Sequence, residues 1–375
     1  MLRVEKQTIG EWLVSHPRAC YDQNFDLAPG EMFMRRRYVT SDVFTDRLFS
    51  GNPVAVVLDG EELSTAQMQA IASGFNYSEK TFVLPPRDPS HAAWVRIFTP
   101  TREIPFAGHP NIGTAFVLAQ QAIERGKSLP ELLVFEEKAG LVPVSLLQEG
   151  GTVAGAELIA PEPLSRHAQV TPERVAACIC LSAETVRTAA HLPQVVSVGL
   201  PFLVVELASR EALSRAKPDR IAYGNLLPLD GAVSIYAYTR DVGSRTPDAG
   251  FDIQARMFTP RMTEDPATGS ATAATVALLA ELQGSTDLSL RVGQGVDMGR
   301  PSRLLAGVRE VDGVPTAYVG GRCVVVTEGT LRLVGDGEPA AGSRQSIGHP
   351  TRASRRRLGS PPAFDAGHHA SDFHH

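Results

Sequence analysis

The chain has 375 residues, of which 43% are hydrophobic and 21% charged, a composition typical of a globular protein large enough for two domains. Its 36 basic and 41 acidic side chains leave a net charge of −5, so we expect neither nucleic acid nor an anionic membrane surface as a partner. The longest apolar run, near Ala271–Leu282, is too short to cross a bilayer. The first residues lack the apolar core of a secretory signal, so we expect a cytoplasmic protein.

Cysteine usage argues against disulfides and against a metal site. The four cysteines, Cys20, Cys178, Cys180 and Cys323, are too sparse for a disulfide framework. Cys178 and Cys180 form a C-x-C pair, but no second Cys or His pair follows at zinc spacing. We interpret them as small buried residues of a helix and predict no metal ligands.

The two ends differ from the rest of the chain. Residues 1–36 have a mixed pattern and end near the basic run Arg35–Arg37, which indicates a peripheral extension rather than a domain. Residues 337–375 are rich in Gly, Ser, Pro and Arg, a composition that cannot bury a core. We therefore predict a disordered tail there.

The first elements alternate strand, strand, helix, strand. Tyr38–Phe44 and Asn52–Gly60 read as two strands, and Ser64 begins a helix that is capped by a box motif. That helix runs out near Gly74–Asn76, and Thr81–Leu84 reads as the next strand. Glu79 lies in the short loop between them, which is expected at the mouth of that strand.

An internal repeat organises the rest of the chain. RIFTPTREIPFAGHPNIGTAFVLA (residues 96–119) corresponds to RMFTPRMTEDPATGSATAATVALLA (residues 256–280) with one residue inserted. The matched pairs are Arg96 with Arg256, Phe98 with Phe258, Thr99 with Thr259, Pro100 with Pro260, Pro105 with Pro266, Gly108 with Gly269, and Thr114 with Thr275. Each copy predicts a strand, a loop, a glycine turn and a helix that is apolar all round and therefore buried. We assign residues 37–160 with 320–336 to one lobe and residues 161–319 to the other.

The two helix starts carry the residues best suited to chemistry. The first holds His109 and Pro110, and the second holds Thr268–Ser270. Free backbone N–H groups and the positive end of the helix dipole bind anions there. If the lobes face each other across a pseudo-twofold axis, both starts point into one carboxylate pocket. His109 and Asp265 would be its titratable groups, and Ser270 would be a hydrogen-bond donor.

Each of these residues also has a purely structural interpretation. His109 could cap its helix, Ser270 could be an N-cap, and Asp265 could simply stabilise the helix dipole. Glu79, in a polar loop, is by pattern a solvated surface carboxylate. The residues alone leave these alternatives open.

Several strings together resemble the phenazine-biosynthesis PhzF-like proteins. They are FTDRLFSGNPVAVVLDG, FNYSEKTFVLPP, RIFTPTREIPFAGHPNIGTAFVL, EDPATGSATAA and GQGVDMGRPSRL, and the resemblance extends from Tyr38 to Val334. It implies an α/β (α+β) fold of the diaminopimelate-epimerase type. In that fold, two pseudosymmetric lobes each curl a mostly antiparallel sheet around a central helix. A homodimer is also implied.

The resemblance also implies an activity and a site. It implies an isomerase that needs no metal or organic cofactor and moves a proton between carbons of a small carboxylic acid. In the phenazine enzyme this acid is trans-2,3-dihydro-3-hydroxyanthranilate. The segment NYSEKTF gives Glu79 the role of catalytic acid/base. The substrate-binding residues implied by the other motifs are Gly108, His109, Asp265, Gly269 and Ser270.

Rival functions remain. Racemases of this fold use two cysteines at the helix starts, whereas this chain has His109 and Ser270 there. A serine hydrolase lacks support because no G-x-S-x-G elbow occurs. Gly293, Gly295 and Gly299 have the wrong spacing for a dinucleotide site. A cofactor-independent epimerase of another small acid and a non-catalytic acid-binding protein both stay open.

Overall fold

The computed structural model describes residues 33–128, 130–242 and 250–334. The predicted tail, 337–375, and most of the predicted extension lie outside these residues. Strand β1 begins at Phe33, so the last four residues of the predicted extension 1–36 are strand. Among the residues that the structure describes, no helix is long and apolar enough to span a membrane.

The first half of the described chain contains eight strands and two helices. In chain order they are β1 (Phe33–Val43), β2 (Asn52–Val57), α2 (Thr65–Phe75), β3 (Glu79–Leu84), β4 (Ala93–Phe98), β5 (Glu103–Ile104), α3 (Gly108–Glu124), β6 (Leu132–Glu137), β7 (Gly140–Glu149) and β8 (Thr152–Ile159). Helix α2 begins as predicted: Ser64 is its N-cap and forms the capping box with Gln67. Glu79 is the first residue of β3, so the strand begins two residues earlier than the sequence pattern indicated.

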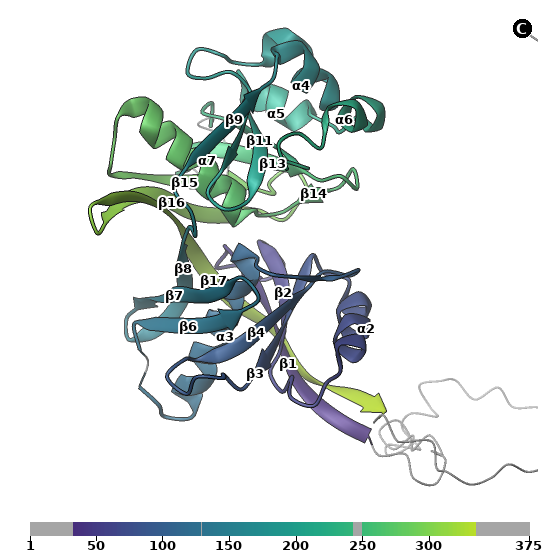
Figure 1. The fold of residues 1–375 in the computed structure, drawn as a ribbon, viewed down its shortest axis with the longest axis vertical. Helices are drawn as coiled ribbons and strands as arrows, with labels where there is room; N and C mark the ends of the chain where they lie inside the picture. The colour runs from purple at the N-terminus through teal and green to yellow at the C-terminus, as the bar shows by residue number, and fades with distance from the viewer. Residues whose placement is uncertain (1–32, 129, 243–249, 335–375) are drawn as a thin grey trace, which may run out of the picture. The chain divides into compact units, whose positions relative to one another are not determined.

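The second half contains the remaining nine strands, four α-helices and one short 3-10 helix. In chain order they are β9 (Ser165–Gln169), α4 (Pro172–Cys178), η1 (Ala183–Thr185), β10 (Gln194–Ser197), β11 (Pro201–Glu206), α5 (Arg210–Arg215), α6 (Arg220–Leu226), β12 (Ile235–Thr239), β13 (Ile253–Phe258), β14 (Glu264–Asp265), α7 (Gly269–Gln283), β15 (Leu288–Gln294), β16 (Ser302–Val311) and β17 (Val314–Val334). Figure 1 shows both halves, with most of these elements labelled.

The same order of strand pairing occurs in both halves. β2 and β3 pair in parallel, β3, β4 and β5 pair antiparallel in turn, and β4 and β6 pair in parallel. β11, β12, β13, β14 and β15 repeat this series of pairings, and β17 then pairs with β8 of the first half. The described chain therefore has a mixed α/β fold in which one pseudosymmetric series of strand pairings occurs twice within a single 17-stranded, mostly antiparallel sheet, and each series has its own central helix.

Equivalent ion pairs show that the sequence repeat is also a structural repeat. In the first copy Arg96 Nε lies 2.8 Å from Glu103 Oε1, and in the second Arg256 Nη2 lies 2.7 Å from Glu264 Oε2. Each guanidinium also stacks on the phenylalanine two residues later in its strand. These half-buried pairs fix the hairpin that leads into each central helix.

The two central helices form the middle of the core. α3 lies against β1, β2 and β8, and α7 lies against β15 and β16 (Figure 1). Both helices are buried along most of their length, from His109 to Val117 in α3 and from Ala271 to Ala280 in α7. This burial follows from their lack of a polar face, because a helix that is apolar all round must be covered on every side. Rigid burial fixes the position of both helix starts.

Candidate active site

The starts of α3 and α7 meet. A Cβ placed on Gly108, the first residue of α3, would lie 4.0 Å from the backbone N of Ser270 in α7. Neither N-cap residue, Ala107 nor Thr268, provides a side-chain hydrogen bond to its helix. The first-turn amides of two helices therefore face one region without side-chain caps, an arrangement that favours a bound anion.

The structural interpretations of His109 and Ser270 as caps are wrong. Both are the second residue of their helices, not the residue that precedes the helix. His109 is buried, and its Nε2 has no hydrogen-bond partner among the described residues. Its Nδ1 lies 3.5 Å from Asn52 Nδ2, whose two hydrogens already go to Asp265 and Ala267.

Glu79 lies next to His109. Parallel pairing of β2 with β3 sets Glu79 beside Val54, and its Oε2 lies 3.7 Å from His109 Nδ1. The Glu79 side chain is 21% exposed, so it is not the solvated surface carboxylate that its polar surroundings in sequence suggested. Burial lowers the pKa of His109, while the charge of Glu79 raises it in part.

Asp265 completes the group from the second repeat. Its Oδ1 accepts a hydrogen bond from Asn52 Nδ2 at 3.0 Å, and its Oδ2 accepts one from the Thr268 hydroxyl. Burial, and next the negative charge of Glu79, raise the pKa of Asp265 to about 7. Two carboxyl groups from different repeats therefore share one site at which ionisation of both is disfavoured.

Asn52 links these residues, and the sequence reasoning missed it. Its side chain is fully buried and also donates to the Ala267 carbonyl at 2.8 Å, while its Oδ1 accepts from the Ser78 hydroxyl at 3.3 Å. It thus connects the turn before Glu79 to the loop before α7. The residue belongs to the family-like string FTDRLFSGNPVAVVLDG, but only its position at the start of β2 shows which groups it reaches.

Lys80 is the other residue that sequence reasoning missed. It is fully buried, and its Nζ donates to the Tyr77 carbonyl at 2.9 Å. Burial lowers its pKa to about 8. The contact fixes the turn that precedes Glu79.

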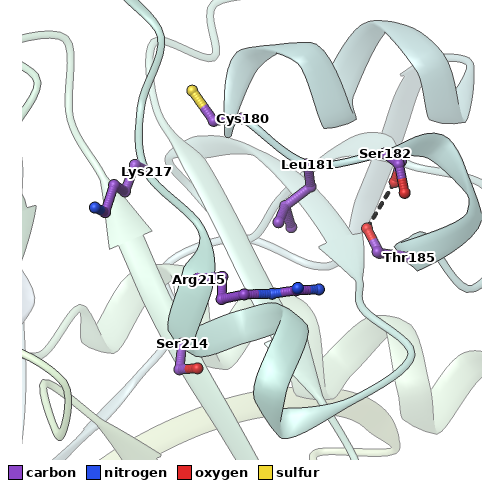
Figure 2. Close-up of a pocket in the computed structure, with 7 residues that line it drawn as sticks. All are labelled: Cys180, Leu181, Ser182, Thr185, Ser214, Arg215 and Lys217. Carbon is purple, nitrogen blue, oxygen red and sulfur yellow. Dashed lines mark hydrogen bonds between the residues drawn. The ribbon is translucent and has the colours of Figure 1, made fainter.

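A cavity of about 700 Å³ lies beside α4 and α5 and contains none of the predicted site residues. Figure 2 shows its lining, with Cys180, the cations Arg215 and Lys217, and several hydroxyls. Cys180 is exposed and follows the end of α4, so the interpretation of the C-x-C pair as buried helical residues is wrong for Cys180 and holds for Cys178 alone. Thr185 donates its hydroxyl to the Ser182 carbonyl at 2.7 Å, and Arg215 pairs with Glu211. The residues that line it include neither a carboxylate nor a histidine, so this cavity is a weaker candidate than the region where the helix starts meet.

The chain matches the model of a known family over most of the described residues. The match covers residues 41–329, and the family is that of the phenazine biosynthesis-like proteins. An uncharacterised isomerase of Mesorhizobium japonicum is 38% identical over 79% of this chain and 98% of its own length. The trans-2,3-dihydro-3-hydroxyanthranilate isomerase of Pseudomonas aeruginosa is 35% identical over 76% of this chain and 98% of its own length.

Solved structures agree on the fold. A predicted epimerase of Pseudomonas aeruginosa aligns with a TM-score of 0.65 and 32% identity over 79% of this chain and 99% of its own. A hydroxyproline epimerase of Agrobacterium vitis aligns with a TM-score of 0.54 over 80% of this chain and 92% of its own, at 13% identity, which shows a shared fold alone. The family match and the relatives named as isomerases together establish that this chain belongs to the phenazine biosynthesis-like family of isomerases.

Proposed function

We propose that this enzyme isomerises trans-2,3-dihydro-3-hydroxyanthranilate, or a cyclic unsaturated acid of the same kind, by moving a proton from one carbon to another. Glu79 takes the proton and returns it. The observation that carries this proposal is the meeting of Glu79 and His109 from one repeat with Asp265 from the other, beside two uncapped helix starts. The Pseudomonas relatives that are named for this reaction support the choice of substrate.

The surroundings of Glu79 suit removal of a proton from carbon. Such a proton leaves only if the remaining charge is stabilised, and the first-turn amides near Gly108, Gly269 and Ser270 provide fixed positive dipoles for the substrate carboxylate. His109 Nε2 is a buried ring nitrogen with no partner among the described residues, so it is available to the substrate. Burial favours the protonated form of Asp265, so this residue need not add a second negative charge to the site.

The division of labour between the repeats follows from this geometry. The first repeat supplies the base and the histidine, and the second supplies Asp265 and Ser270. We further propose that residues 37–160 with 320–336 form one lobe, that residues 161–319 form the other, and that the protein is a homodimer. Size-exclusion chromatography with light scattering measures the oligomeric state directly.

One incubation in D₂O separates the proposed reaction from its rivals. Incubation with trans-2,3-dihydro-3-hydroxyanthranilate in D₂O, followed by NMR, should give a new constitutional isomer with deuterium at the receiving carbon. A one-carbon epimerase, favoured by the relative described as a predicted epimerase, would exchange a proton without moving a double bond. A binding protein would perturb the ligand resonances without any exchange.

A further inference from the structure

Two buried polar side chains near the start of α3 have no hydrogen-bond partner among the described residues. They are Glu137, the last residue of β6, and Asn111, the fourth residue of α3. Both carboxyl oxygens of Glu137 and both polar atoms of Asn111 are closed off from solvent and make no hydrogen bond to any described residue. Buried polar groups in native proteins are nearly always hydrogen-bonded, so four such atoms need an explanation. Neither residue has a role in the proton transfer proposed above.

The two side chains lie close to each other. Burial raises the pKa of Glu137 to about 8, and the nearby Asn111 amide offsets part of this rise. The two groups thus interact, although no pair of their atoms has hydrogen-bond geometry. The torsions that orient terminal carboxyl and amide groups are soft, so a small rotation can align them.

The repeat gives Glu137 an equivalent residue in the second half of the chain. β6 pairs with β4, and β15 pairs with β13, in the same parallel register when both are counted from the matched arginines of β4 and β13. Phe135 therefore corresponds to Val292, and Glu137, two residues later, corresponds to Gln294.

Gln294 holds the start of α7 in place. It is fully buried, and its Oε1 accepts from the Thr268 backbone N at 3.1 Å. Its Nε2 donates to the Asp265 carbonyl at 2.8 Å and to the Thr268 hydroxyl at 3.0 Å. The end of β15 is thereby joined to the loop that leads into α7.

The first repeat has no hydroxyl for such a contact, because Ala107 stands where the second repeat has Thr268. We propose that Glu137, in its protonated form, is a positioning residue that pairs with Asn111 and so fixes the start of α3, including His109. Its O–H donates to Asn111 Oδ1, and its carbonyl oxygen accepts from Asn111 Nδ2. A carboxylate has acceptors only and would leave Oδ1 without a donor. This inference rests on the proposed function, in which His109 contacts the substrate.

The pairing depends on pH. With a pKa of about 8, Glu137 keeps its proton at neutral pH and loses it as the pH rises through that value. Charged side chains on the surrounding strands have partners of their own: Glu136 pairs with His91, Arg96 and Lys138 pair with Glu103, and Glu149 of β7 pairs with Arg322. His109 is the titratable group in the first turn of α3, and burial lowers its pKa. The start of α3 should therefore loosen at alkaline pH.

Hydrogen–deuterium exchange of the full chain at pH 7 and pH 9, read by mass spectrometry on peptides covering residues 104–112, tests the proposal. Glu137→Gln carries an amide that can pair with Asn111 at every pH. Glu131→Gln, at an exposed glutamate directly before β6, is the matched control. All three proteins should exchange alike at pH 7. At pH 9 only about a tenth of Glu137 keeps its proton, so the wild type and Glu131→Gln should exchange about tenfold faster than Glu137→Gln. Peptides covering residues 265–273, at the start of α7, should not differ.

Equal exchange by the wild type and Glu137→Gln at pH 9, or a difference of the same size at the start of α7, would overturn the proposal. Turnover extends the test to His109: between pH 7 and pH 9, kcat/KM of the wild type should fall about tenfold relative to that of Glu137→Gln. Asp265 and Lys80 titrate in both proteins, so this ratio reports on Glu137. A constant ratio would overturn the link to His109. Lack of turnover by all three proteins would count against the proposed function alone, because the exchange measurement needs no substrate and decides this proposal by itself.

Discussion

Replacement of Asp265 by asparagine should make the protein more stable at alkaline pH while impairing its activity. The folded state raises the pKa of this carboxyl from 3.8 to about 7, first through burial and then through the charge of Glu79. The folded state therefore holds the proton more tightly than the unfolded chain does. Stability from this group is complete below about pH 4 and declines as the pH rises to about 7.

The size of the effect follows from the two pKa values. A difference of about 3 pH units corresponds to roughly 4 kcal/mol, which the wild type loses fully above pH 7. Asparagine does not ionise, so the variant has no cost of a buried negative charge at this position. It keeps an oxygen for Asn52, and the Thr268 hydroxyl can turn to accept from the new amide. We expect the variant to gain about 2–4 kcal/mol at pH 8.5 relative to the wild type, and little at pH 4.

Urea denaturation at pH 4, 6 and 8.5 measures these differences. Asp252→Asn is the control, because Arg291 holds the pKa of Asp252 below its usual range. Loss of this solvent-exposed pair should cost less than about 1 kcal/mol above pH 4, the opposite sign. If Asp265→Asn were equally destabilising at all three pH values, the carboxyl would not be a buried acid with a raised pKa.

Three further predictions concern residues around the central helices. Glu137 is largely buried near Asn111 of α3, and burial raises its pKa to about 8. The wild type should therefore lose stability as the pH rises from about 4.5 to 8, and Glu137→Gln should lack this loss in urea melts. An unchanged pH profile would show that this carboxylate reaches water. Lys80→Met should lower kcat/KM by on the order of tenfold, because the turn before Glu79 loses the hydrogen bond from Lys80 to the Tyr77 carbonyl. The free energy of unfolding should change by less than about 1.5 kcal/mol. Wild-type kinetics in this variant would refute the positioning role of Lys80. Leu278→Ala should cost about 2–5 kcal/mol because Leu278 is fully buried in α7, and a cost below about 1 kcal/mol would contradict its core position.

The repeat was the part of the fold that the sequence predicted best. Matched residues such as Arg96 and Arg256 occupy equivalent places and form equivalent ion pairs. Apolar helices without a polar face could only be core helices, and α3 and α7 are. The capping box at Ser64 is a local pattern, which explains why it could be located to the residue.

The network around Asn52 could not be predicted, because it depends on contacts that are distant in sequence. The hydrogen bond from Asn52 to Asp265 joins residues 213 positions apart, and only strand pairing brings them together. Lysine is usually a surface residue, and nothing in the sequence around Lys80 indicates that β3 buries it. The start of β3 at Glu79 is set by parallel pairing with β2 rather than by the polar residues before it.

The most direct test of the account is deuterium transfer by the wild type and by Glu79→Gln, with trans-2,3-dihydro-3-hydroxyanthranilate in D₂O monitored by NMR. Glu62→Gln, which changes an exposed glutamate that pairs with Arg36 and with none of the site residues, is the matched control. The account predicts that the wild type and Glu62→Gln isomerise the acid with deuterium at the receiving carbon, and that Glu79→Gln stays folded but loses at least about a thousandfold in rate. Full activity of Glu79→Gln would contradict the assignment of this carboxylate as the acid/base.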